Sequence, residues 1–169
     1  ADNLDPVAII SYYYSDSYKS IKDKRQKKEK EQIKSEQDAP YPSYDNLYAE
    51  LNEEKPNLIF TIKNSSGKVV KKEFRKPSKG LQRFHWNLRY EDNSPISLSS
   101  SSFYNPFAGV SEGTLVNPGA YTVELDLYDE GSITNLVSPV SFNVKALDNT
   151  VMPAEDRTAK VAFQREVSK

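Results

Sequence analysis

Three segments of the chain alternate apolar and polar residues. They are residues 57–70 (NLIFTIKNSSGKVV), 79–90 (KGLQRFHWNLRY) and 117–127 (NPGAYTVELDL). A period of two predicts a β-strand with one face on a core and the other face in water. The side chains expected to point inward are Leu58, Phe60 and Ile62 in the first segment, Phe84, Trp86 and Leu88 in the second, and Tyr121, Val123, Leu125 and Leu127 in the third.

Turn residues and two further apolar segments extend this pattern to an antiparallel fold. Residues 64–67 (NSSG) predict a tight turn in which Gly67 takes a positive φ, after which the chain returns as a hairpin partner. Residues 7–14 (VAIISYYY) are rich in β-branched and aromatic side chains and predict a first strand. A last strand is predicted in residues 133–145, where Pro139 indicates an edge position or a bulge.

The region between the first two predicted strands has a different character. Residues 19–38 hold eight basic and five acidic residues, with Ile21 and Ile33 as the only aliphatic side chains. Good helix formers dominate, which predicts a solvated helix that touches the body at its ends. A phosphate-binding strip is the alternative, although acidic residues are interleaved throughout. Ser43 is expected to cap a second, short helix that runs to Glu53.

The C-terminal residues predict one more helix. Pro153 suits the first turn of a helix, because its missing N–H has no partner there in any case. Ala159, Phe163 and Val167 give this helix an apolar stripe.

The length of 169 residues fits one domain with an insertion and a terminal extension. We therefore expect residues 1–148 to form a β domain that contains a helical insertion at about residues 16–55. Residues 149–169 are expected to begin a C-terminal helical segment that continues in a longer protein.

Composition narrows the classes of partner. The formal net charge of −1 gives no overall field to attract nucleic acid or an anionic membrane surface. No apolar run approaches the roughly 18–20 residues that span a bilayer. Cysteine is absent, which excludes disulfides and thiolate metal sites. We expect neither a nucleic-acid partner nor membrane insertion.

The sequence shows no motif for catalysis, metal binding or a cofactor. His85 is the only histidine, so a multi-histidine metal site is impossible. A Gly-rich phosphate loop, an EF-hand pattern and a serine elbow are all missing. No motif in the sequence indicates the pair of carboxylates that glycoside hydrolysis requires. We expect no catalytic residue, no metal ligand and no cofactor in this chain.

Five side chains remain as candidates for ligand binding. Tyr44 lies in the predicted insertion, and Tyr104 and Phe107 lie in a long serine-rich segment before the third strand. His85 and Arg89 are expected on the outward face of the second strand. The aromatic rings are of the kind that stacks on sugar rings, and the competing interpretation is that they pack the insertion and the long segment onto the body.

Several of these segments together resemble a known domain. The succession SSGKVV, KGLQRFHWNLRY and NPGAYTVEL resembles the β-sandwich domain that follows the β-propeller in bacterial sortilin-like (VPS10/BNR-repeat) proteins, which are often labelled glycosyl hydrolases. KRQKKEKEQ and APYPSYDNLYAE resemble the helical insertion of some members, and MPAEDRTAKVAFQ resembles the start of their C-terminal helical region. Fibronectin-III-like and FlgD-like sandwiches share the PGxYxV strand.

The resemblance implies an antiparallel sandwich of the immunoglobulin or fibronectin-III type with about seven strands. It also implies a non-catalytic accessory domain that packs against an upstream propeller in a secreted, periplasmic or cell-envelope protein. The Asp-box pattern of the propeller, S-x-D-x-G-x-x-W, does not occur here, so no functional residue is transferred. The alternative hypothesis is a carbohydrate-binding module that uses the exposed aromatics.

Overall fold

The computed structural model of the protein describes residues 6–93, 106, 112–147 and 155–167. Within these residues the chain is mainly β, as the alternating segments predicted, and it forms six strands and three helices. The elements, in chain order, are β1 (Ala8–Tyr14), α1 (Ile21–Lys34), α2 (Tyr44–Leu51), β2 (Asn57–Asn64), β3 (Val69–Arg75), β4 (Gly80–Trp86), β5 (Gly119–Asp129), β6 (Ser132–Val144) and α3 (Arg157–Val167).

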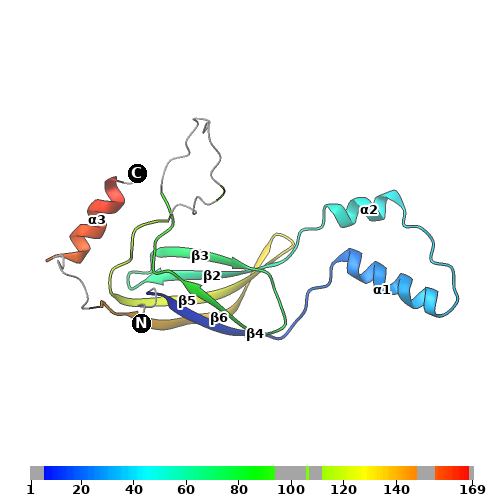
Figure 1. The fold of residues 1–169 in the computed structure, drawn as a ribbon, viewed down its shortest axis with the longest axis horizontal. Helices are drawn as coiled ribbons and strands as arrows, with labels where there is room; N and C mark the ends of the chain where they lie inside the picture. Colours follow the sequence, from blue (N-terminus) through cyan, green and yellow to red (C-terminus); the bar gives the residue numbers. More distant parts are fainter. Residues whose placement is uncertain (1–5, 94–105, 107–111, 148–154, 168–169) are drawn as a thin grey trace.

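The strands form two antiparallel sheets of unequal size. The larger sheet has the order β3-β2-β5-β6, and the smaller sheet pairs β1 with β4. The two sheets pack face to face over a shared core (Figure 1). The Phe60 ring of β2 lies between the sheets, with ring centroids 4.8 Å from Tyr12 of β1 and 4.7 Å from Phe84 of β4.

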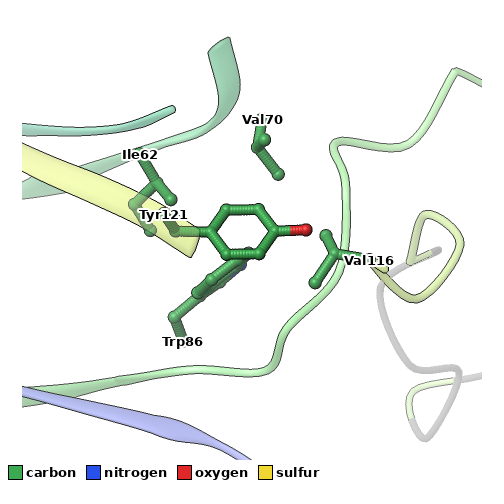
Figure 2. Close-up of a cluster of buried hydrophobic side chains, with 5 residues drawn as sticks. All are labelled: Ile62, Val70, Trp86, Val116 and Tyr121. Carbon is green, nitrogen blue, oxygen red and sulfur yellow. The ribbon is translucent and has the colours of Figure 1, made fainter. Parts of the chain in front are cut away.

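The inward faces of the strands form most of this core, as their alternation predicted. In β2 the face that was expected in water is buried as well, at Ile59 and Thr61. Trp86 is fully buried, and its ring meets Tyr121 edge-on at a centroid distance of 5.8 Å. Figure 2 shows the Tyr121 ring among the side chains around it, with its hydroxyl pointing toward the segment that carries Val116. The buried apolar side chains are Leu58, Ile59, Phe60, Ile62, Val70, Phe84, Trp86, Val116, Tyr121, Leu125 and Val161.

Two predictions about turns and edges are confirmed. Gly67 has a φ of 77° in the turn between β2 and β3. The Asn64 side chain closes that turn by accepting hydrogen bonds from the backbone N–H groups of Ser66 at 3.1 Å and Lys68 at 2.9 Å. β6, which contains Pro139, lies at an edge of the larger sheet, and its pairing with β5 has two register shifts.

The insertion between β1 and β2 consists of α1 and α2, which project from one end of the β body (Figure 1). Ser20 and Ser43 cap the two helices, and neither helix has a buried residue, so the predicted solvated helix is confirmed. Arg25 of α1 donates two hydrogen bonds to Glu50 of α2, at 2.5 and 3.0 Å, and one to Glu29 at 2.6 Å. This ion-pair cluster holds the helices together where apolar packing is lacking.

α3 lies at the opposite end of the body from the insertion (Figure 1). Its predicted stripe does not face the body, because Phe163 and Val167 are exposed and Val161 is the buried residue. The reason is that the Arg165 guanidinium lies over the Tyr90 ring, 4.2 Å from its centroid. Val161 and Arg165 are four residues apart and share a helical face, so this contact turns that face inward. Across the described residues, no helix combines the length and the apolar character needed to cross a membrane.

Candidate functional site

The predicted ligand-binding residues lie in separate parts of the molecule. Tyr104 and Phe107 fall outside the described residues. Tyr44 is exposed on α2, in the projecting insertion, and His85 is exposed on the outer face of β4. Arg89 follows β4 at the other end of the body, one residue before the Tyr90 ring that contacts α3.

Tyr44 belongs to an exposed aromatic pair. Its ring stacks with that of Tyr48 one helical turn away, with centroids 6.1 Å apart and planes inclined by 23°. Both rings are exposed on α2, and Leu51 continues the same side of the helix with 83% of its surface in water. Exposed aromatic and aliphatic side chains of this kind are apolar surface that a sugar ring or a protein partner can cover.

The alternation with His85 predicts Arg89 on the outward face of a strand, but Arg89 lies beyond the end of β4. β4 ends at Trp86, and Leu88 takes a left-handed φ of 56°, which folds the following residues back. The Tyr90 N–H donates to Thr114 at 2.9 Å, and the Val116 N–H donates to Leu88 at 2.8 Å. The chain after β4 is therefore paired with the chain before β5.

The Arg89 side chain stabilises this pairing through Glu112. It donates to Glu112 Oε2 at 2.9 Å and to the Gly113 carbonyl at 3.0 Å, while Asn87 donates to Glu112 Oε1 at 3.0 Å. We call these contacts the Glu112 bridge. No local sequence signal identifies Glu112 as a partner, because more than twenty residues separate it from Arg89.

A hollow of about 510 Å³ lies beside the Glu112 bridge, between this connection and α3. Its lining contains one acidic side chain, Glu112, and four basic ones, Arg89, Lys145, Arg157 and Lys160. This charge favours a small anion over a cation. No group of three or more histidine, aspartate or glutamate side chains is placed to hold a metal ion within the part of the chain that the structure describes.

Tyrosine hydroxyls fix two other points of the structure. The Tyr128 hydroxyl of β5 donates to Glu54 at 2.6 Å and thereby connects the insertion to the body, and this hydrogen bond raises the pKa of Tyr128. The Tyr121 hydroxyl donates to the Asn117 carbonyl at 2.6 Å, and burial raises the pKa of Tyr121 to about 12.

Tyr121→Phe is expected to weaken the loss of stability at alkaline pH. An unfolded tyrosine ionises near pH 10, whereas buried Tyr121 keeps its proton to about pH 12, so the unfolded state binds fewer protons between these values. The free energy of unfolding of the parent chain therefore falls as pH rises from 10 to 12. Urea unfolding followed by circular dichroism at several pH values measures this slope.

The same variant should lose about 1 kcal/mol at neutral pH, because it lacks the hydrogen bond to Asn117. Tyr13→Phe is the matched control, because Tyr13 is exposed on β1, and it should stay within about 0.5 kcal/mol of the parent at neutral pH. Equal slopes in Tyr121→Phe and the parent chain would contradict the assignment.

Comparisons with known proteins find no match: neither a protein-family model, nor a curated protein, nor a solved structure matches the chain.

Proposed function

We propose that the chain is a non-catalytic accessory domain that contacts neighbouring domains of a larger secreted or cell-envelope protein. The proposal rests mainly on one observation. α2 and α3 lie at opposite ends of the β body (Figure 1), and both carry exposed apolar side chains. At one end Tyr44, Tyr48 and Leu51 lie on α2, and at the other Phe163, 67% exposed, and Val167 lie on α3. Clustered exposed apolar side chains mark surfaces that other proteins cover.

The polar contacts of the described residues support a structural role. The Arg25–Glu50 pair holds the two inserted helices together, the Tyr128–Glu54 hydrogen bond attaches them to β5, and the Glu112 bridge holds the connection after β4. Each group is committed to the fold, whereas a catalytic acid or base must reach a substrate within a cleft.

We propose that the parent protein is a sortilin-like propeller protein. We also propose that this chain has the fold of an immunoglobulin or fibronectin-III sandwich. The residues that carry the resemblance have structural roles that fit this proposal. Gly67 of SSGKVV makes the turn after β2, and Trp86 and Tyr121 of the other two motifs pack on each other in the core. Propeller repeats with the S-x-D-x-G-x-x-W pattern are expected upstream of this chain in the full-length protein.

Hydroxyl-radical footprinting of the isolated chain and of the full-length protein tests this role. Tyr44, Tyr48 and Phe163 should be oxidised in the isolated chain and protected in the full-length protein, because neighbouring domains cover them. Tyr13, exposed on β1, serves as the internal reference. Equal oxidation of the helical residues in both samples would refute the accessory role, and an upstream sequence without the propeller pattern would refute the parentage alone.

The stacked Tyr44–Tyr48 pair favours a second candidate, a carbohydrate-binding module. Both rings are exposed, and an exposed tyrosine ring can stack on a sugar ring. A glycan array probed with the isolated chain should then show saturable binding that is lost in Tyr44→Ala and in Tyr48→Ala but kept in Tyr13→Ala. Binding that is insensitive to both tyrosines would exclude this surface as the sugar site.

A further inference from the structure

The two sheets leave part of the core-facing side of β6 uncovered. On the larger sheet, the inner faces of β5 and β6 pair Leu125 with Val137 and Val123 with Val140. Leu125 of β5 is 6% exposed, whereas Val137 and Val140 of β6 are 44% and 54% exposed. The smaller sheet has two strands over a sheet of four, and its cover ends at β1.

A groove of about 440 Å³ follows this uncovered strip. One side is β1 from Ala8 to Tyr12, and the floor includes Val137, Val140 and Phe142 of β6. Within the described residues β1 pairs with β4 alone, so the backbone donors and acceptors on its other edge face the groove. The groove therefore combines an open strand edge with an apolar floor.

The charges are distributed unequally among the edge strands. Charged residues make up 28% of the chain, yet the seven residues of β1 and the thirteen of β6 contain none. β3, at the opposite edge of the larger sheet, carries Lys71, Lys72, Glu73 and Arg75. Charged side chains protect sheet edges from pairing with other strands, so β3 is protected whereas β1 and β6 are not.

One charged residue, Glu124, lies along the groove, but it alternates with the inward residues Val123 and Leu125, so its side chain points to the opposite face of the sheet. There it forms an ion pair with Lys63 of the neighbouring strand β2. A charged segment entering the groove would lose its hydration without gaining a counter-charge, which costs free energy. An uncharged segment pays no such cost, so the groove selects against charge.

The edge that is available for pairing is that of β1. Pro139 lacks a backbone N–H, and it lies where β6 departs from regular register with β5. β1 contains no proline, and its register with β4 is continuous from Ala8 to Tyr14.

We propose that this groove binds an extended, uncharged polypeptide strand with apolar side chains at alternate positions, which pairs with the free edge of β1. Its main chain would add a third strand to the smaller sheet, and its apolar side chains would cover Val137 and Val140. Strand addition of this kind takes its affinity from main-chain hydrogen bonds and its selectivity from the side chains that point into the groove. The inference goes beyond the accessory role and does not depend on the parent protein.

A synthetic peptide of sequence TVNVTVNVT, labelled with fluorescein, tests the proposal by fluorescence anisotropy with the whole chain. Saturable binding is expected, and Val140→Lys should weaken it by about tenfold or more, because it places an unpaired charge in the groove. Ile133→Lys is the matched control in the same strand. Ile133 is exposed and pairs with Tyr128 on the opposite face of the sheet, so its replacement should leave the affinity unchanged.

Two modified peptides separate main-chain pairing from general apolar binding. N-methylation of every second residue removes the N–H donors from one edge of the extended peptide. Of two such peptides, one methylated at the odd residues and one at the even residues, one should fail to bind. The peptide TENETENET should not bind. Equal affinity for the parent peptide and both N-methylated registers, or for the charged peptide, would overturn the proposal.

The state of the free protein provides the remaining outcomes. Hydrogen exchange should show unprotected amides on the outer edge of β1, and protection there would show that the chain already covers this edge and would overturn the proposal. A dimer that Val140→Lys dissociates would also overturn it, because a second copy would then occupy the groove. Val137→Lys provides a second groove variant if Val140→Lys alters the circular dichroism spectrum.

Discussion

Trp86→Ala is expected to lower the free energy of unfolding by about 3–5 kcal/mol, the range for removing a large buried aromatic side chain. Trp86 is fully buried, and its ring meets both Tyr121 and Phe142 edge-on, at centroid distances of 5.8 and 6.1 Å. Its indole N–H also donates to the Arg89 carbonyl at 3.0 Å. The substitution therefore opens a cavity and leaves a partly buried carbonyl without its donor.

A loss of this size is a large part of the stability of an ordinary domain, about 5–15 kcal/mol. Urea unfolding followed by far-ultraviolet circular dichroism measures it, because Trp86 is the only tryptophan and the variant has no indole fluorescence. Phe163→Ala is the control, since its exposed ring should cost less than 1 kcal/mol, roughly the surface range. A loss in Trp86→Ala as small as that of the control would contradict the assigned core.

Gly113→Ala is expected to cost about 1–3 kcal/mol, through steric overlap. A Cβ atom at this position would lie 2.3 Å from the Tyr90 carbonyl oxygen and 2.6 Å from that of Glu91. Both atoms belong to backbone, so the methyl group can be accommodated only if the two paired segments separate. This separation would strain the hydrogen bonds that Tyr90 and Val116 make across the connection.

The measurement for Gly113→Ala is urea unfolding together with amide exchange at Tyr90 and Val116, which should become faster than in the parent. Leu115→Ala is the matched control, because Leu115 lies in the same segment and is 47% exposed. If Gly113→Ala keeps the stability and the exchange rates of the parent, the added methyl group fits between the two segments, and the predicted steric overlap is wrong.

Local features of the fold were predictable from the sequence because their causes lie within a few residues. The alternation of Leu58, Phe60 and Ile62 identified a buried face, since a strand turns every second side chain to the same side. Gly67 marked a turn that needs positive φ, and Ser43 marked a helix start because its hydroxyl accepts from the Asn46 N–H. Each of these signals acts through its immediate neighbours.

Features that depend on distant partners were not predictable in the same way. Leu88 and Arg89 continue the alternation of β4, yet the chain folds back at Leu88 because it pairs with residues near Val116. In α3 the apolar stripe through Phe163 faces solvent, because Arg165 packs on the ring of Tyr90 instead. Tyr90 lies far from α3 in the sequence. The groove beside β1 likewise follows from how many strands each sheet contains.

The place of the insertion in the chain has a consequence for the order in which the domain folds. β1 pairs with β4 across 65 intervening residues, between Tyr14 and Gly80, and the insertion with α1 and α2 lies within them. The insertion more than doubles the loop, and each doubling adds about 0.6 kcal/mol of closure entropy. The hairpin of β2 and β3 closes far sooner, because a short turn joins its strands. We therefore infer that β1 joins late, onto a larger sheet whose apolar face is exposed until β1 arrives.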